Sequence, residues 1–315
     1  MYEAILEYLA CPICQAGLGL AVEDREANEI LSGQLACGNG HSFVIRQGVA
    51  DFGSQEQQKS NTWSAVYAKQ DYEELDRRIE EGKTPRQLAQ ERSAFQDLIS
   101  RINARKPDCI LDVGTGRGMF LLALLEGYTY QPSTIVCLDL SFPVLARDRL
   151  KVTQRGSVHR VSYIAADIAT MPFRGGSVPL VASYFGLGNM DGDMIPTGIS
   201  EIHRVLRAGG CLLDSTDVYR PGSASIQTLA AFWKRQGKQV ARNYFDEVDI
   251  ARIYADSPFG RAQMAVLYEA IAEPNGDRVP VEGDWYARLT VVAETAVSVP
   301  AALRPADSPE PSGDC

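Results

Sequence analysis

Residues 108–217 alternate between short apolar strands and amphipathic helices, and this alternation restricts the fold more than any other feature of the chain. The expected strands lie at 109–113, 134–140, 161–167, 179–187 and 210–218, with helices at 119–128, 142–154 and 194–208. Strands that are continuously apolar are buried on both faces, which predicts a parallel sheet between two layers of helices. Two longer alternating segments, 261–274 and 284–297, predict a final hairpin at the sheet edge.

A glycine-rich loop follows the first of these strands. Its glycines are Gly114, Gly116 and Gly118, a spacing that differs from the G-x-G-x-x-G pattern of dinucleotide-binding folds. Glycines at this position let the backbone approach a ligand closely. Asp112 precedes the loop, and Asp139 and Asp167 close the second and third strands. A carboxylate at the end of the second strand can accept both hydroxyls of a ribose, so the sequence predicts a nucleoside-containing cofactor here.

This combination resembles the class I S-adenosylmethionine-dependent methyltransferases over residues 108–217. The resemblance implies a Rossmann-like fold, with a seven-stranded, mostly parallel sheet that ends in an antiparallel C-terminal hairpin. It also implies that S-adenosyl-L-methionine is the cofactor. Asp112, Gly114, Gly116 and Gly118 would contact its methionine end, Asp139 would bind the ribose, and Asp167 with Ile168 would bind the adenine.

The segments SYFGLGNM and ISEIHRVLRAGG resemble the menaquinone- and ubiquinone-biosynthesis type of methyltransferase. Two residues depart from that pattern. Ala208 stands where the subfamily usually has proline, and Pro179 stands where it often has aspartate. These departures concern the subfamily and leave the class unaffected.

The acceptor is expected on the side of the sheet where the fourth and fifth strands end. The residues there are mainly aromatic with a few polar groups, namely Tyr184, Phe185, Asn189, Asp191, Asp217 and Tyr219. Such a wall suits a planar or partly apolar acceptor. If the reaction needs a general base, the candidates are Asp217, Asp191 and Tyr219, although a structural or capping role is the stronger interpretation of each. No Asn-Pro-Pro-Tyr-like motif or Pro-Cys nucleophile follows the fourth strand, which disfavours methylation of DNA bases.

Four potential metal ligands lie near the amino terminus. They form a Cys-x2-Cys pair and a Cys-x3-His pair, made of Cys11, Cys14, Cys37 and His41. Two close pairs separated by a hairpin-length spacer can place four ligands tetrahedrally around zinc. A complete set of four protein ligands leaves no open position, so we expect a structural Zn2+ in a small zinc ribbon.

A zinc ribbon before such a core also resembles the bacterial ribosomal-RNA guanine-N1 methyltransferases, in which the metal unit helps to recognise RNA. The negative charge of the chain favours a substrate other than RNA. The chain has 31 basic and 40 acidic residues, a net charge of −9. Residues 1–53 hold two arginines against seven carboxylates, or −5, whereas a unit that grips RNA should be basic. We therefore expect a small-molecule acceptor. The alternatives are the rRNA enzyme and a non-catalytic cofactor-fold binding module; a nicotinamide oxidoreductase fits the glycine spacing poorly.

The sequence divides into a zinc-binding unit at 1–53, a linker and helical cap at 54–107, a methyltransferase domain at 108–299 and a disordered tail at 300–315. A homodimer contact through the zinc unit is one further expectation. No run of 18 apolar residues occurs, and the first residues lack the basic and apolar regions of a signal peptide. We accordingly expect no membrane partner and a cytoplasmic location.

Overall fold

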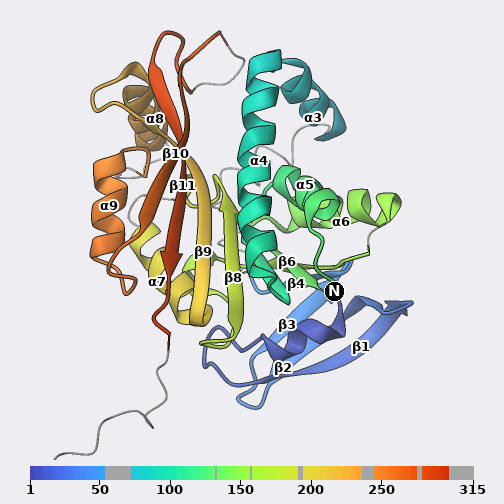
Figure 1. Ribbon diagram of the computed structural model, residues 1–315. Helices are drawn as coiled ribbons and strands as arrows, with labels where there is room; N and C mark the ends of the chain where they lie inside the picture. Colours follow the sequence, from blue (N-terminus) through green and yellow to red (C-terminus); the bar gives the residue numbers. More distant parts are fainter. Residues whose placement is uncertain are drawn as a thin grey trace, which may run out of the picture.

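The computed structural model describes residues 1–53, 72–131, 133–156, 158–190, 194–235, 244–274 and 279–297. The strands in these residues form one sheet of eleven, in the order β1-β2-β3-β4-β7-β6-β5-β8-β9-β11-β10 (Figure 1). Residues 54–71 of the linker and helical cap proposed at 54–107, and the tail proposed at 300–315, lie outside the described residues.

Seven strands form the expected mostly parallel core of the sheet. They are β5 (Cys109–Val113), β6 (Thr134–Asp139), β7 (Arg160–Ala165), β8 (Val178–Tyr184), β9 (Leu206–Tyr219), β10 (Gln263–Ile271) and β11 (Trp285–Glu294). The first five pair in parallel, whereas β11 lies antiparallel between β9 and β10. The predicted fold class is therefore confirmed, and the final hairpin is inserted so that β10 forms the edge.

Four amino-terminal strands continue this sheet beyond β7. They are β1 (Leu18–Glu26), β2 (Glu29–Cys37), β3 (Ser42–Arg46) and β4 (Val49–Asp51). The first three connections are antiparallel, and β4 then pairs in parallel with β7, with Val49 opposite Tyr163 and Asp51 opposite Ala165. The boundary near residue 53 remains a prediction, but the strands on its two sides belong to one hydrogen-bonded sheet.

Helices cover both faces of the sheet, as Figure 1 shows. On one face lie α4 (Pro85–Arg105), α5 (Met119–Gly127) and α6 (Phe142–Arg155), whose apolar side chains pack on Ile110, Ile135 and Tyr163. On the other face lie α7 (Ile195–Val205) and α9 (Glu247–Ala255), which pack on Leu111, Val136 and Leu212. The remaining helical elements are η1 (Glu3–Glu7), α3 (Tyr72–Glu81), η2 (Ile168–Thr170) and α8 (Ala224–Arg235).

Local sequence explains where two of these helices begin or end. Thr84 begins α4 with a capping box, because its side chain accepts from the Gln87 amide while the Gln87 side chain accepts from the Thr84 amide. Helix α7 was expected to reach residue 208 and instead ends at Val205. Leu206 is already extended and pairs with Val178 of β8, so the sheet takes over the last predicted turn.

None of the described helices has the length and apolar character that crossing a bilayer requires.

Candidate functional site

The glycine loop between β5 and α5 adopts a backbone that other residues would resist. Gly114, Gly116 and Gly118 have φ angles of +66°, +51° and +70°, in the left-handed region that favours glycine. A Cβ added to Gly114 would lie 2.5 Å from the Cα of Gly186, at the end of β8. The loop is thus held against the β8 end at backbone distance, and the amide of Gly114 donates to the Leu138 carbonyl at 2.8 Å.

Asp112 lies beneath this loop and is only 1% exposed. Its Oδ2 accepts from the Thr115 hydroxyl at 2.6 Å, and Oδ1 has no hydrogen-bond partner among the described residues. Burial raises the pKa of Asp112 to about 7, against a smaller lowering by Thr115 and a further increase from nearby Asp139. A buried carboxyl with a spare oxygen can accept from a group brought in by a ligand.

Asp139 ends β6 beside the loop. The Gly116 amide donates to its Oδ2 at 3.0 Å, and the Ser141 amide donates to its Oδ1 at 2.9 Å. Burial raises the pKa of Asp139, while these backbone donors act in the opposite direction. The carboxylate is therefore fixed in position and directly linked to the middle glycine.

Asp167 follows β7 and caps η2, because its Oδ1 accepts from the Ala169 amide at 2.8 Å. This contact is an N-cap, a role that by itself requires no ligand. Ile168 is buried beneath α7, where a Cβ on Gly198 would lie 3.4 Å from its Cγ2. Since β5, β6 and β7 are neighbours and parallel, Asp112, Asp139 and Asp167 line one edge of the sheet in spatial order.

The three candidate bases have different surroundings. Asp217 is buried and forms a two-point ion pair with Arg288, its register partner on β11, with Nη2 to Oδ2 at 3.3 Å. Tyr219 is buried, and burial raises its pKa well above the usual value. Asp191 lies outside the described residues.

Arg288 is a buried charged residue beside these candidates that sequence reasoning missed. Its Nη1 donates to the Tyr184 hydroxyl at 3.1 Å, and its guanidinium lies 4.4 Å from the Phe185 ring centroid. Phe185 itself has a φ of +60°, an uncommon conformation for a bulky residue. The signal in the sequence was a single arginine within the apolar run of β11, which burial there required to be paired.

A second buried polar group lies on the opposite face of β9. Asp214 accepts from the Tyr244 hydroxyl at 2.9 Å, and this hydroxyl lies 3.0 Å from that of Tyr254. Burial raises the pKa of Asp214 to about 6, although hydrogen bonds from Ser183 and Tyr244 lower it in part. Tyr244 and Tyr254 belong to the helical layer around α9, so this network joins that layer to the sheet.

The predicted metal ligands converge in space. Each of Cys11, Cys14, Cys37 and His41 offers one ligand atom, and these atoms all lie within 4.8 Å of one another. The Cys14 and Cys37 sulfurs are 3.7 Å apart, and His41 Nδ1 lies 3.5 Å from Cys11 Sγ and 3.4 Å from Cys37 Sγ. Donors about 2.3 Å from a tetrahedral zinc would be about 3.8 Å apart. Three thiols and an imidazole at these distances fit a Zn2+ ion.

Two turns hold the ligands in place. The Gln15 amide donates to the Cys11 carbonyl and the Gly40 amide to the Cys37 carbonyl, at 2.8 and 3.0 Å. The hairpin of β1 and β2 brings the two turns together, as the spacing predicted. Hydrogen bonds from the Ala16 backbone and the Asn39 side chain lower the pKa of Cys14 to about 6, which favours the thiolate that binds metals.

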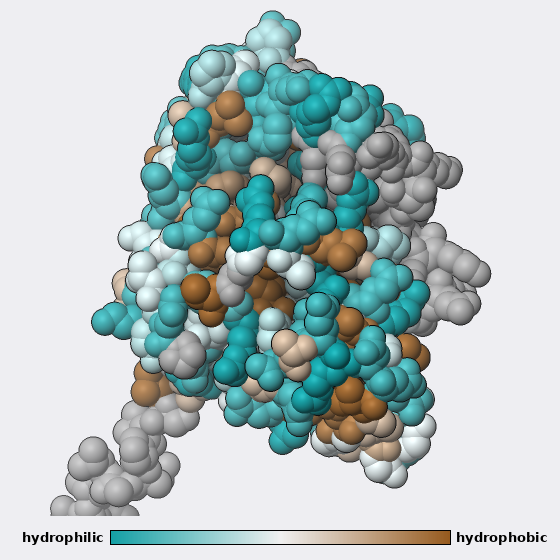
Figure 2. Space-filling model, turned by 90° about the vertical axis from the view of Figure 1, so that its right-hand side faces the viewer, coloured by the Kyte–Doolittle hydropathy of each residue, from teal (hydrophilic) through white to brown (hydrophobic). Residues whose placement is uncertain are grey.

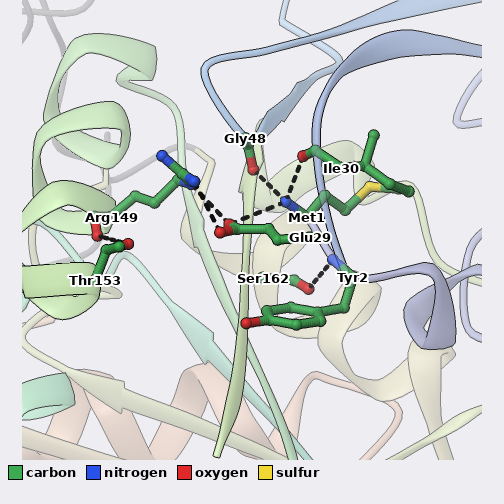
Figure 3. A network of polar contacts seen from close by, with 8 residues as sticks. All are labelled: Met1, Tyr2, Glu29, Ile30, Gly48, Arg149, Thr153 and Ser162. Carbon is green, nitrogen blue, oxygen red and sulfur yellow. Dashed lines mark hydrogen bonds and ion pairs between the residues drawn. The ribbon is translucent and has the colours of Figure 1, made fainter. Parts of the chain in front are cut away.

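A buried polar network joins this amino-terminal unit to α6 and β7, as Figure 3 shows. The carboxylate of Glu29 accepts from Arg149 Nε and Nη2, both at 2.7 Å. The Met1 amino group donates to the carbonyls of Ile30 and Gly48, and the Tyr2 amide donates to Ser162 Oγ at 3.0 Å. Because the Arg149 side chain is only 9% exposed, loss of Glu29 would leave an uncompensated positive charge in the interface.

Hydrophobic residues also reach the surface. Figure 2 shows them gathered near the middle of the face that lies on the right in Figure 1, with hydrophilic residues around them.

Comparison with known proteins identifies the sheet core. Residues 110–210 match the family described as Methyltransferase domain. The demethylmenaquinone methyltransferase of Bacteroides fragilis is 29% identical over 126 residues, which are 40% of this chain and 50% of that protein. The 23S rRNA (guanine(748)-N(1))-methyltransferase of Streptomyces fradiae is 30% identical over 217 residues, which are 68% of this chain and 64% of that protein. The chain thus spans about half to two thirds of these curated relatives.

Among solved structures, the [4+2]-cyclase SpnF shares the fold with a TM-score of 0.51 at 17% identity, covering 78% of this chain and 98% of that one. At this identity the likeness concerns the fold alone.

Proposed function

We propose, from the methyltransferase domain that residues 110–210 form, that the chain transfers the methyl group of S-adenosylmethionine to an acceptor. The observation that carries this proposal is the row of carboxylates beside the glycine loop. In it, Asp112 and the loop of Gly114, Gly116 and Gly118 hold the methionine end, Asp139 binds the ribose, and Asp167 with Ile168 binds the adenine. The spare oxygen of Asp112 and the Gly116–Asp139 contact support this assignment.

The cofactor supplies a methyl group that is already strongly electrophilic. The chain therefore has to align the donor with the acceptor and to exclude water. The close contact of Gly114 with Gly186 ties the cofactor loop to the end of β8, from which Tyr184 and Phe185 arise. A shift of the cofactor loop would therefore move the end of β8, so the positions of the methyl donor and of the acceptor are fixed together.

On the acceptor side, we assign Arg288 the role of a fixed cation among aromatic rings. Asp217 orients it through two contacts, which commit both oxygens of the Asp217 carboxylate to the ion pair. Tyr219, with its raised pKa, remains a neutral phenol and serves as part of the wall. Asp191, which lies outside the described residues, remains a candidate base.

A planar small molecule suits this wall best. Its ring would pack against the aromatic side chains around the Arg288 guanidinium, and an oxygen on the ring would lie toward this cation. The charge of residues 1–53 supports the same choice. Both arginines of this unit, which the structure describes completely, are ion-paired within it: Arg25 with Glu3 at 3.2 Å and Arg46 with Asp51 at 2.8 Å. Neither is left unpaired to grip a phosphate backbone.

The second candidate function is methylation of ribosomal RNA at a guanine. The observation that favours it is the length of the match to the Streptomyces fradiae enzyme, because 217 aligned residues extend well beyond residues 110–210. Guanine is also planar and carries an exocyclic oxygen on its ring, so the proposed acceptor wall does not by itself exclude it.

One assay separates these functions. The purified chain is incubated with methyl-labelled S-adenosylmethionine and either hydroxylated naphthoquinols or unmodified 23S rRNA, and calorimetry with S-adenosylmethionine and NAD provides the cofactor control. We expect cofactor binding and label in a small aromatic acceptor. Label in rRNA, together with binding that weakens about a thousandfold between roughly 50 and 200 mM salt, would establish the RNA enzyme instead.

Cofactor binding with no methyl transfer to either acceptor class would favour the non-catalytic module. The cyclase that shares this fold is named for a reaction other than methyl transfer, so the fold alone does not decide the reaction.

We also propose that Cys11, Cys14, Cys37 and His41 bind one structural Zn2+. The four donor atoms are close enough to surround the ion completely, which leaves no position for a substrate or water. Metal analysis of the purified chain tests this proposal, with about one zinc per chain expected.

A further inference from the structure

The first metal-binding turn is hydrogen-bonded directly to the segment that follows Asp167 and Ile168, the residues proposed to bind the adenine. We define the first knuckle as residues 9–17, which contain Cys11 and Cys14, and the bracing segment as residues 171–174, which come directly after η2. Leu9 forms an antiparallel bridge with Phe173. The Ala10 amide donates to the Pro172 carbonyl at 3.0 Å, and the Arg174 amide donates to the Tyr8 carbonyl at 2.8 Å.

Arg204, in the last turn of α7, links the same two segments through its side chain. Its Nη1 donates to Gln15 Oε1 at 3.1 Å and to the Phe173 carbonyl at 2.9 Å, and its Nη2 donates to the Met171 carbonyl at 3.2 Å. Glu201, one turn earlier, fixes this guanidinium through contacts at 2.6 and 2.7 Å and accepts from the Met171 amide at 2.9 Å. One arginine thus touches the knuckle and the bracing segment together.

The bracing segment has little freedom to move independently of η2. Met171 and Phe173 are completely buried. Ile168 in η2 packs under α7, the helix that carries Arg204. A change in the knuckle would therefore be passed to Asp167 and Ile168 through hydrogen bonds and buried side chains.

We propose that Arg204 is a positioning residue that couples metal binding at the knuckle to cofactor binding at Asp167 and Ile168. The inference rests on the proposed function, because it requires both the zinc ion and the adenosyl cofactor to bind. The coupling is reciprocal by thermodynamic necessity: if the metal strengthens cofactor binding, the cofactor strengthens metal binding by the same factor.

The test measures zinc release from the full chain. Zinc-loaded protein is mixed with an excess of a chromogenic chelator, alone or with saturating S-adenosylhomocysteine, adenosine or methionine. We expect S-adenosylhomocysteine and adenosine to slow release about tenfold, and methionine to leave it unchanged, because the coupling runs through the adenine side. Calorimetry on zinc-loaded and metal-free preparations of the chain shows whether S-adenosylhomocysteine binds the metal-free chain about tenfold more weakly than the zinc-loaded chain.

Two variants identify the path. In Arg204→Ala the slowing should vanish, and in Gln15→Ala, which removes one contact at the surface, it should fall to about twofold. Gln47→Ala is the matched control, because Gln15 and Gln47 share left-handed backbone, with φ of 57° and 50°, and Gln47 is exposed in the same unit. The control should retain the tenfold effect. Gln15→Ala keeps the test decisive if Arg204→Ala does not fold.

The outcomes distinguish this inference from the function on which it rests. If the zinc-loaded wild-type chain does not bind S-adenosylhomocysteine, the proposed function fails. If it binds and zinc leaves equally fast with and without it, the coupling is overturned while the function stands. Equal protection by methionine and by adenosine would overturn the assignment to the adenine side.

Discussion

The metal cluster and the glycine loop hold their proposed ligands by opposite means. At the cluster, four side chains from two turns converge, and the backbone serves mainly to present them. At the loop, backbone at positive φ would receive the proposed ligand, and the missing side chains of Gly114 and Gly118 leave room for Gly186 and Asp148. Removing atoms should therefore damage the first site, whereas adding atoms should damage the second.

The largest expected effect comes from removing one ligand atom at the cluster. In Cys37→Ser the zinc content should fall below about a tenth of an equivalent. The free energy of unfolding should fall by about 5 kcal/mol or more, because metal-binding free energy contributes directly to folding. Metal analysis and urea titration measure these two quantities. Cys211→Ala alters a buried thiol outside the cluster and should keep its zinc; full zinc content in Cys37→Ser would contradict the ligand set.

Adding one carbon to the loop should have the next largest effect. Gly114→Ala forces a Cβ against the Gly186 backbone and should weaken S-adenosylhomocysteine binding about a hundredfold, or roughly 3 kcal/mol. Gly156→Ala is the control, since Gly156 has a φ of +69° and nothing within 4 Å of the added atom. Calorimetry on both variants compares crowding with backbone strain, and equal losses would show that crowding is unimportant.

Asp112 offers a pH test of how the loop is supported. Its pKa is about 7 in the folded chain against 3.8 without burial, so between these values the folded state binds more protons than the unfolded state. Stability should therefore fall as pH rises, by roughly 2 kcal/mol between pH 5 and 7. Asp112→Asn should lack this fall in denaturant titrations at several pH values. Asp108→Asn, at an exposed carboxylate, should retain it; an unchanged slope in Asp112→Asn would contradict the prediction.

The smallest loss of cofactor affinity is expected at Asp139, whose side chain contacts the backbone of the loop. Asp139→Asn keeps an oxygen for the Gly116 amide but removes an acceptor that the ribose would use. We expect about tenfold weaker binding of S-adenosylmethionine, equivalent to about 1.4 kcal/mol, with zinc content unchanged. Calorimetry measures the affinity. A variant that binds as tightly as the wild type would remove Asp139 from the proposed cofactor site.

The sequence predicted those features whose determinants lie close together in the chain. The metal ligands could be identified because each pair sits within one turn. The loop was evident because Asp112 and the three glycines occupy seven consecutive residues. The start of α4 is encoded just as locally, because the capping residue Thr84 is followed directly by Pro85.

The contacts that the sequence did not predict join residues that are distant in the chain. Asp217 and Arg288 are 71 residues apart and meet only because β11 inserts beside β9. Likewise, Gly186, after β8, supports Gly114, after the neighbouring strand β5, and Asp214 meets Tyr244 from another layer. A periodicity or motif reports which face a residue occupies, but not which strand lies next to it.

Because β4 pairs in parallel with β7, the amino-terminal strands cannot join the rest of the sheet until β7 has been synthesised. Val49 pairs with Tyr163, which is synthesised 114 residues later. At about 5 to 20 residues per second, β4 waits roughly 6 to 23 seconds for its partner. During that interval the β1–β4 unit has an unpaired edge. A metal ion that binds early would keep this unit folded until the remaining strands of the sheet form.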